Sequence, residues 1–181
     1  ARLAETLRIA DFTSWMGVPA IGIHVGFVSE DWRSDEFADV VDVLRTVCGH
    51  CADLGLRVHL ETGQETADTL LQLLETVDRE NLAVNFDPAN MILWPARYAQ
   101  ELGEPYDRLK WFEKFQPNEG ALALADAIVH THAKDAMVFD DGTRKEVPLG
   151  EGWVDWPRYT GYLLDSGYDG YFAIERETGG D

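Results

Sequence analysis

The chain has 181 residues, and its 33 acidic side chains outnumber its 15 Lys and Arg residues, which gives a formal charge of −18 at pH 7. This charge disfavours nucleic acid as a partner, because a polyanion would be repelled at every approach. Hydrophobic residues make up 45% of the chain, which is too many for a disordered protein and predicts a folded core.

The sequence contains no run that approaches the roughly 18 consecutive apolar residues of a membrane span. Residues 1–5 also lack the basic and apolar pattern of a signal peptide. We therefore expect a soluble, cytoplasmic protein without a membrane partner. Only two cysteines occur, Cys48 and Cys51, which is too few for a disulfide framework.

Apolar periodicity predicts helices and strands that alternate along the chain. In chain order it predicts a helix over residues 1–16, a strand over 20–26, a helix over 37–54, a strand over 56–61, a helix over 66–77 and a strand over 82–87. After a long irregular stretch to residue 118, it predicts a helix over 119–127, a strand over 128–134, a helix over 156–166 and a strand over 170–175. This order indicates an α/β protein with a parallel sheet buried under helices. Because no linker interrupts the pattern, we expect a single domain over residues 1–181.

Polar side chains fall on one face of all five predicted strands, since residues two apart on a strand point the same way. This face carries His24, His59, Glu61, Asn85, Asp87, His130, His132, Lys134 and Glu175. The opposite face carries apolar residues expected to pack under helices: Ile21, Ile23, Val25, Val58, Leu60, Val84, Phe86, Ile128, Phe172 and Ile174. In a parallel barrel the polar face is the interior, and active sites lie at its carboxyl end.

Carboxylates and imidazoles that converge in a low-dielectric interior are costly unless a cation compensates them. For any single polar residue, the alternative is a buried group with local hydrogen bonds or a residue in an exposed loop. An oxygen-rich set with one imidazole suits one divalent ion such as Mn²⁺, Mg²⁺ or Co²⁺, with Zn²⁺ as a further candidate. The pattern on five strands therefore predicts a metal site.

Several short motifs carry a family resemblance in their order and spacing: His24-Val25-Gly26, Leu60-Glu61-Thr62-Gly63, Asn85-Phe86-Asp87-Pro88-Ala89-Asn90, His130-Thr131-His132-Ala133-Lys134-Asp135, Pro148-Leu149-Gly150-Glu151-Gly152-Trp153-Val154-Asp155-Trp156, and Gly167-Tyr168-Asp169-Gly170 leading to Ile174-Glu175. They resemble the xylose isomerase-like barrel superfamily of sugar isomerases and epimerases. That group includes D-tagatose 3-epimerase, hydroxypyruvate isomerase, inosose dehydratase and endonuclease IV. The resemblance covers nearly the whole chain.

The resemblance implies a (β/α)8 TIM barrel in which one divalent metal is held by Glu61, Asp87, His132 and Glu175. A full barrel needs eight strands and typically about 250 residues. Only five strands are predicted here, so we expect a partial barrel that lacks the first three strands, as in a fragment of a longer protein. Epimerases of the group often carry His where this chain has Asn90.

The implied activity is that of an isomerase or epimerase of a small sugar or sugar phosphate, working through an enediolate. Glu61 and Glu175 are then the candidate catalytic acid and base. The candidate substrate-binding residues, for hydroxyls or a phosphate, are His24, Asn90, Lys134 and Arg144, and His130 is expected to support a ligand from behind. An inosose dehydratase-like lyase and a non-catalytic sugar-binding module stay open as alternatives, whereas the negative charge disfavours an endonuclease.

Two other patterns favour structural roles. The motif Cys48-Gly49-His50-Cys51 matches the redox tetrapeptide of protein disulfide isomerases, but it lies near the carboxyl end of a predicted helix, where the dipole disfavours a thiolate. Six aromatic residues crowd the stretch before residue 118 and favour helix packing, with a pocket wall or a homo-oligomer contact as alternatives: Trp94, Tyr98, Tyr106, Trp111, Phe112 and Phe115.

Overall fold

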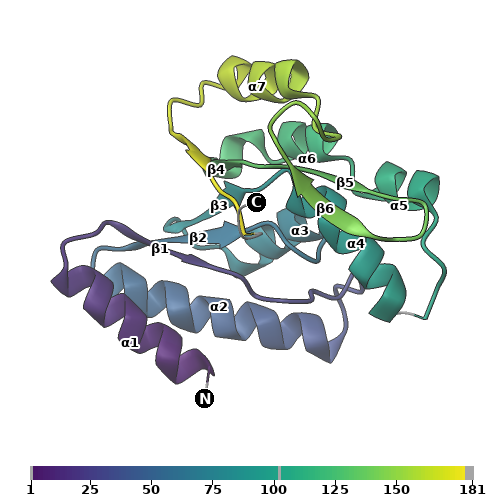
Figure 1. Ribbon diagram of the computed structural model, residues 1–181. Helices are drawn as coiled ribbons and strands as arrows, with labels where there is room; N and C mark the ends of the chain where they lie inside the picture. Colours follow the sequence, from purple (N-terminus) through teal and green to yellow (C-terminus); the bar gives the residue numbers. More distant parts are fainter. Residues whose placement is uncertain (1, 102, 178–181) are drawn as a thin grey trace.

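A parallel sheet of five strands organises the protein, whose computed structural model describes residues 2–101 and 103–177 (Figure 1). The strand order is β1-β2-β3-β4-β7, and each neighbouring pair is parallel. The strands are β1 (Ala20–Ile23), β2 (Arg57–Glu61), β3 (Leu82–Phe86), β4 (Ile128–Ala133) and β7 (Phe172–Ile174). The predicted α/β architecture, a half-barrel of five parallel strands, is therefore confirmed.

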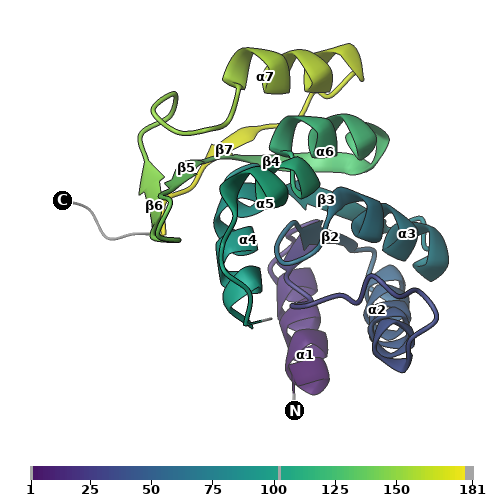
Figure 2. The same ribbon diagram turned by 90° about the vertical axis from the view of Figure 1, so that its right-hand side faces the viewer.

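Helices α2, α3, α6 and α7 cover one side of the sheet in sequence order, whereas α4 packs on α5 and on the strands β5 and β6 (Figure 2). Helix α2 packs on α3, α3 on α6, and α6 on α7, while α1 packs on α2 and β1. The helices are α1 (Arg2–Trp15), α2 (Asp35–Asp53), α3 (Ala67–Val77), α4 (Asn90–Glu101), α5 (Arg108–Lys114), α6 (Pro117–Ala123), the 3₁₀ turn η1 (Ala125–Ala127) and α7 (Trp156–Asp165). No helix in the described residues is long and apolar enough to cross a membrane.

The main core lies between the sheet and these helices. Val58, Leu60, Val84 and Phe86 are at most 1% exposed, as strand alternation predicts for the helix-facing side. Ile174 is the exception, because it is 85% exposed on the edge strand β7, where no described element covers it. The expectation that Ile174 packs under a helix is therefore wrong in this structure.

The stretch expected to be irregular contains helices α4 and α5. Pro95 lies inside α4, where it removes one helical hydrogen bond and lowers the local preference for a helix. Burial offsets that loss, because Met91, Ile92, Ala96 and Ala99 are all at most 2% exposed. Tertiary packing therefore decides the structure here against local preference.

A second, antiparallel pair of strands went unpredicted: β5 (Asp135–Val138) and β6 (Arg144–Val147). Their hairpin closes through Asp141 and Gly142, and Gly142 has a φ of 82°, a conformation that favours glycine. The Asp-Gly pair was the available signal. Short strands of mixed polarity hid it, because only Asp135, Ala136, Val138 and Glu146 are buried.

Both cysteines lie in α2 and are 0% exposed. Burial raises the pKa of the Cys48 thiol to about 11 and also raises the pKa of Cys51. The two side chains pack with Ile21 and Val58, which supports a core role.

Candidate metal centre

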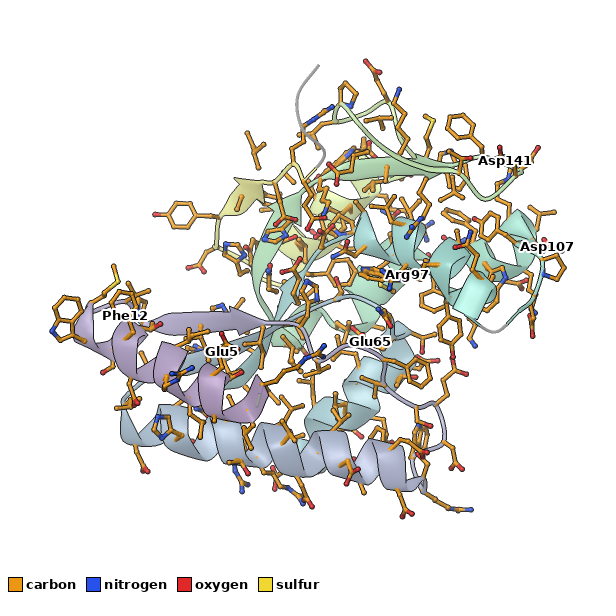
Figure 3. The ribbon with its side chains drawn as sticks, turned by 60° about the horizontal axis from the view of Figure 1, so that its bottom comes forward. Glu5, Phe12, Glu65, Arg97, Asp107 and Asp141 are labelled. Atoms are coloured by element: carbon orange, nitrogen blue, oxygen red, sulfur yellow. The ribbon has the colours of Figure 1, made fainter. Side chains whose placement is uncertain are left out.

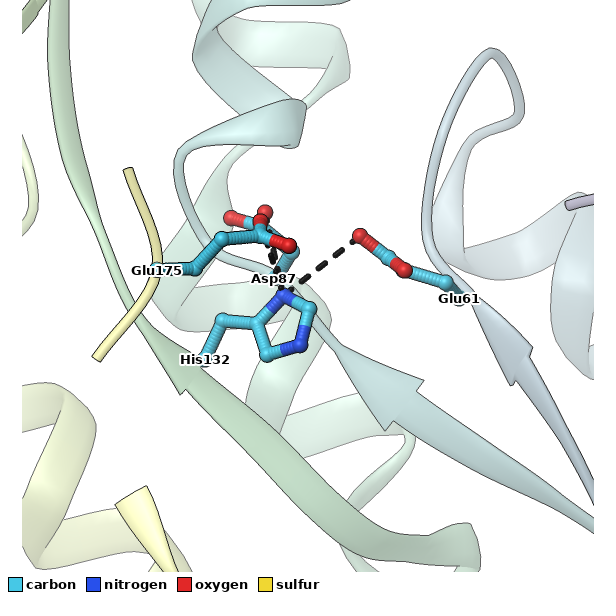
Figure 4. Close-up of side chains that lie close together, drawn as sticks. All are labelled: Glu61, Asp87, His132 and Glu175. Atoms are coloured by element: carbon cyan, nitrogen blue, oxygen red, sulfur yellow. Dashed lines mark ion pairs between the residues drawn. The ribbon is translucent and has the colours of Figure 1, made fainter. Parts of the chain in front are cut away.

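Four side chains from four different strands converge at the carboxyl ends of β2, β3, β4 and β7 (Figure 4). One ligand-type atom from each of Glu61, Asp87, His132 and Glu175 lies within 4.8 Å of the other three. The Nδ1 atom of His132 is central: it is 3.4 Å from Glu61 Oε1, 3.5 Å from Asp87 Oδ2 and 3.1 Å from Glu175 Oε2. The parallel arrangement creates this cluster, because Glu61 ends β2, Asp87 and Glu175 directly follow β3 and β7, and His132 is the last residue but one of β4.

Asp87 is the most firmly fixed of the four. Its Oδ1 accepts hydrogen bonds from the backbone N–H groups of Ala89 (2.9 Å) and Asn90 (3.2 Å) at the start of α4. Its backbone is tied to β2, because the Asp87 N–H donates to Thr62 Oγ1 and the Thr62 hydroxyl donates to the Asp87 carbonyl. The carboxylate is 0% exposed, and its other oxygen, Oδ2, points to His132.

Glu61 is held from the β1 and α4 sides. Its Oε2 lies 3.4 Å from His24 Nε2, and its Oε1 accepts a hydrogen bond of 3.3 Å from the Asn90 amide. Burial by itself would raise the pKa of Glu61, but the imidazoles of His132 and His24 lower it to about 2. Glu61 therefore carries a negative charge at neutral pH.

The pKa values of His132 and Glu175 are shifted by burial and by the neighbouring charged groups. Burial would lower the pKa of His132, but Asp87 and Glu61 outweigh burial and raise it to about 10. Burial raises the pKa of Glu175 despite the opposing effect of Lys134. Positive charge at the centre of the cluster therefore stabilises its carboxylates.

Lys134 supplies one positive charge from the end of β4. Its side chain is 1% exposed, and Nζ lies 3.1 Å from Asp87 Oδ2, 3.0 Å from Glu175 Oε2 and 2.8 Å from Glu177 Oε2. The side chain of Glu146 from the hairpin is 4.0 Å away. Burial would lower the pKa of Lys134, but Asp87, Glu177 and Glu175 raise it.

The donor set fits a divalent cation. Among the described residues, Asp87 Oδ2 and His132 Nδ1 are buried atoms that face the centre without a hydrogen bond of normal geometry, although both lie at ion-pair distance from charged groups. Three carboxylates and one imidazole offer oxygen and nitrogen donors typical of Mn²⁺, Mg²⁺, Co²⁺ or Zn²⁺ sites. The four residues predicted as ligands are therefore brought together, and their coordination of a metal stays a prediction.

The residues predicted to bind substrate have different positions. His24 and Asn90 contact Glu61, and Lys134 lies among the carboxylates. Arg144 is exposed on β6 and lines a separate hollow with Leu93 and Gln100 from α4, and no described contact joins it to the four converging side chains. Their contacts with a substrate stay predictions.

Behind His132, an amide links two imidazoles. His130 Nδ1 lies 2.8 Å from Asn85 Oδ1, and Asn85 Nδ2 lies 3.2 Å from His132 Nε2. His130 thus reaches His132 through Asn85 and also by a direct edge contact between the two rings, whose centroids are 5.5 Å apart. Asn85 lies on the polar face that the sequence predicts, but the sequence indicated no role for it. Strand alternation was the signal for Asn85, but its partners depend on the register between β3 and β4, which shifts beside Asn85.

Sequence reasoning also missed the burial of three carboxylates, Glu65, Asp135 and Glu146 of the hairpin. Glu65 is 4% exposed, its Oε1 accepts from the Gly63 N–H, and burial raises its pKa to about 7 (Figure 3). Asp135 is 1% exposed and accepts hydrogen bonds from the backbone of Gly150 and Gly152 and from the indole of Trp156. The sequence did not indicate their burial, because acidic residues usually lie at the surface, although Asp135 ends one of the motifs that carry the family resemblance.

Comparisons with known proteins agree with this geometry. A family profile described as xylose isomerase-like TIM barrel matches residues 1–180. The crystal structure of a xylose isomerase domain protein from Planctomyces limnophilus is 40% identical with a TM-score of 0.80, covering 97% of this chain and 58% of that one. An L-ribulose-5-phosphate 3-epimerase of Escherichia coli is 27% identical, covering 76% of this chain and 56% of the epimerase. An uncharacterised protein of Methanocaldococcus jannaschii is 25% identical, covering 86% of this chain and 50% of that protein.

The matched relatives are longer than this chain. It spans about half the length of the curated relatives and 58% of the Planctomyces protein. The similarity therefore extends over the described half-barrel, and the activity of the whole protein is a matter for proposal.

Proposed function

The chain belongs to the xylose isomerase-like TIM barrel family, and on that premise we propose that it carries the metal centre of an isomerase or epimerase of a small sugar or sugar phosphate. The observation that carries the proposal is the convergence of Glu61, Asp87, His132 and Glu175 within 4.8 Å. Similarity to an L-ribulose-5-phosphate 3-epimerase supports the same class of substrate. We also propose that residues 1–181 act as one domain.

The four converging side chains would hold one divalent ion, Mn²⁺, Mg²⁺, Co²⁺ or Zn²⁺. When bound, such an ion supplies positive charge against the negative charge that develops on sugar oxygens as a proton leaves carbon. Asp87 suits a purely binding role, because two backbone N–H groups already fix its other oxygen. His132 completes the set through Nδ1.

Glu61 and Glu175 would carry the proton. They approach His132 Nδ1 from opposite sides, Glu61 from β2 and Glu175 from the end of β7 (Figure 4). A sugar between them would meet a carboxylate on each face, so one removes the proton next to the carbonyl and the other returns a proton. Return to the opposite face of the same carbon inverts it, and return to the neighbouring carbon exchanges aldose and ketose.

Polar groups around Glu61 would orient the substrate. His24, directly after β1, and Asn90, at the start of α4, each have a nitrogen within 3.4 Å of the Glu61 carboxylate. Lys134 Nζ lies 3.0 Å from Glu175 Oε2, and in our proposal it contacts a sugar hydroxyl beside that carboxylate. Arg144, exposed on β6, is the cation that would meet a phosphate on a longer substrate.

Deuterium wash-in from heavy water tests the proposal. The full-length protein is incubated with a panel of ketoses and ketose phosphates, with a saturating divalent metal or with a chelator. We expect metal-dependent entry of deuterium next to the carbonyl of at least one substrate together with an isomeric sugar. Loss of water to an unsaturated product would instead favour the lyase. No exchange with any substrate in the panel would contradict the proposal and favour a binding module.

A further inference from the structure

The amide of Asn85 bridges two imidazoles at the back of the metal centre. Asn85 comes from β3 and is 6% exposed, so its polar atoms depend on protein partners. In the structure, Oδ1 faces His130 Nδ1 at 2.8 Å and Nδ2 faces His132 Nε2 at 3.2 Å. Each end of the amide therefore meets one ring nitrogen.

This arrangement ties the position of the proton on His132 to the orientation of the amide. An imidazole that binds a cation through Nδ1 must keep the lone pair there and carry its proton on Nε2. The Nε2–H then needs an acceptor, and an amide offers one only at its oxygen. The Nδ2 group that faces Nε2 in the structure is a donor and would stabilise the other tautomer.

Rotation of the amide by half a turn exchanges Oδ1 and Nδ2 while the carbon atoms stay in place. We propose that Asn85 is a positioning residue for the metal centre: when a divalent cation is bound, Oδ1 accepts the Nε2–H of His132, so that the Nδ1 lone pair faces Glu61, Asp87 and Glu175. This inference rests on the proposed function, because it assumes that the centre binds a cation.

The same rotation of the Asn85 amide fixes the tautomer of His130. Nδ2 then donates to His130 Nδ1, and the proton of a neutral His130 must lie on its Nε2. His130 is not among the converging side chains, yet its tautomer responds to the cation through Asn85. That response distinguishes an orienting amide from a residue that only fills space.

Two substitutions separate acceptor function from packing. Asn85→Leu removes the acceptor while keeping the branching and the number of side-chain heavy atoms, whereas Asn85→Asp keeps an acceptor for Nε2–H. Asn118→Leu is the matched control, because Asn118 is also a buried amide (5% exposed) and donates to the Asp155 carbonyl, away from the centre. Zn²⁺ serves as the probe, since it is diamagnetic and allows ring-nitrogen NMR.

The experiment combines Zn²⁺ titration calorimetry with long-range proton–nitrogen NMR of the imidazoles in the full chain. Loss of such an orienting partner typically weakens metal binding about 10–100-fold, which we expect for Asn85→Leu. Asn85→Asp and Asn118→Leu should bind at least about as tightly as the wild type. In the wild type with Zn²⁺, both His132 and His130 should carry their protons on Nε2.

The outcomes separate this inference from the proposed function. Two results would overturn the role of Asn85 and leave the proposed function standing. One is a Zn²⁺ affinity of Asn85→Leu equal to that of the wild type, and the other is a His130 proton on Nδ1 in the Zn²⁺-bound wild type. A wild-type chain that binds no Zn²⁺ would overturn both proposals. If Asn85→Leu fails to fold by circular dichroism, the His130 tautomer in the wild type still decides.

Discussion

Lys134→Met offers a sensitive test of the charge balance in the candidate metal centre. Methionine keeps most of the apolar stem of the lysine but removes the ammonium group that contacts Asp87 Oδ2 at 3.1 Å and Glu175 Oε2 at 3.0 Å. Both Lys134 and Asp87 are almost completely buried. The variant therefore leaves buried carboxylates without their nearest cation.

Breaking a buried ion pair on one side typically costs about 3–5 kcal/mol in free energy of unfolding. The low end applies here, because Asp87 keeps two backbone N–H donors and His132 remains 3.5 Å from its Oδ2. We therefore expect a loss of about 3 kcal/mol. In the variant, a bound divalent ion replaces the missing positive charge and meets less repulsion. Saturating Mn²⁺ should therefore reduce the difference in free energy of unfolding between Lys134→Met and the wild type by about 1 kcal/mol or more. This corresponds to roughly fivefold tighter binding of the ion by the variant.

Urea unfolding followed by circular dichroism measures both effects, with chelator or with Mn²⁺, near neutral pH. For a valid comparison, the free energy of unfolding must fall equally steeply with urea concentration in both proteins. Lys145→Met is the matched control, because Lys145 is exposed on β6 and should change stability by less than about 0.5 kcal/mol. A loss in Lys134→Met no larger than in the control, or a gap that Mn²⁺ does not narrow, would refute the reasoning.

Three further outcomes follow from buried groups outside the centre. Burial raises the pKa of Glu65 from 4.5 to about 7, so the folded state holds a proton that the unfolded state releases above about pH 4.5. The contribution of Glu65 to the free energy of unfolding therefore falls as pH rises from about 4.5 to 7. In urea unfolding, Glu65→Gln should be more stable than the wild type by up to about 3 kcal/mol near pH 8, and the two proteins should be equally stable near pH 4.5. Asp135→Asn should cost about 1–3 kcal/mol and speed amide hydrogen exchange at Gly150, because an amide cannot accept all the donors that meet the carboxylate. Cys48 and Cys51 should react with an aromatic disulfide reagent only at the rate of unfolding, since both are 0% exposed.

Each of these expectations has an outcome that contradicts it. Equal stability of Glu65→Gln and wild type near pH 8 would show that Glu65 is not strained by burial of its charge. Unchanged exchange at Gly150 in Asp135→Asn would mean that the carboxylate does not fix the loop. Reaction of either cysteine within the mixing time would place the thiol at the surface.

The sequence predicted the five parallel strands, because the alternation of apolar and polar residues that marks a strand is local and recurs in each of them. Each of the five strands combines an apolar face with a polar residue at its carboxyl end, and alternation alone assigns those faces. Glu61, Asp87 and Glu175 then converge because parallel strands end at the same edge of a sheet. The convergence required no knowledge of loops.

Contacts that depend on register or on loops were not predictable. Lys134 meets Glu177 and Glu146, which come from the segment after β7 and from the hairpin, so its enclosure depends on two connections that periodicity does not describe. Asn85 contacts His130 and His132 beside a register shift between β3 and β4, which alternation does not predict. Such partners are set by packing in three dimensions.

The central claim is that Glu175 moves a proton while Asp87 holds the cation, and one paired measurement tests it. Deuterium wash-in and metal content are determined on the same samples of wild type, Glu175→Gln and Asp87→Asn in the full-length protein. Gln keeps one oxygen for the ion but cannot accept the proton, so Glu175→Gln should retain metal and lose exchange by about 100-fold or more. Asp87→Asn should lose the metal itself. Wild-type exchange in Glu175→Gln with metal bound would contradict the two-glutamate account.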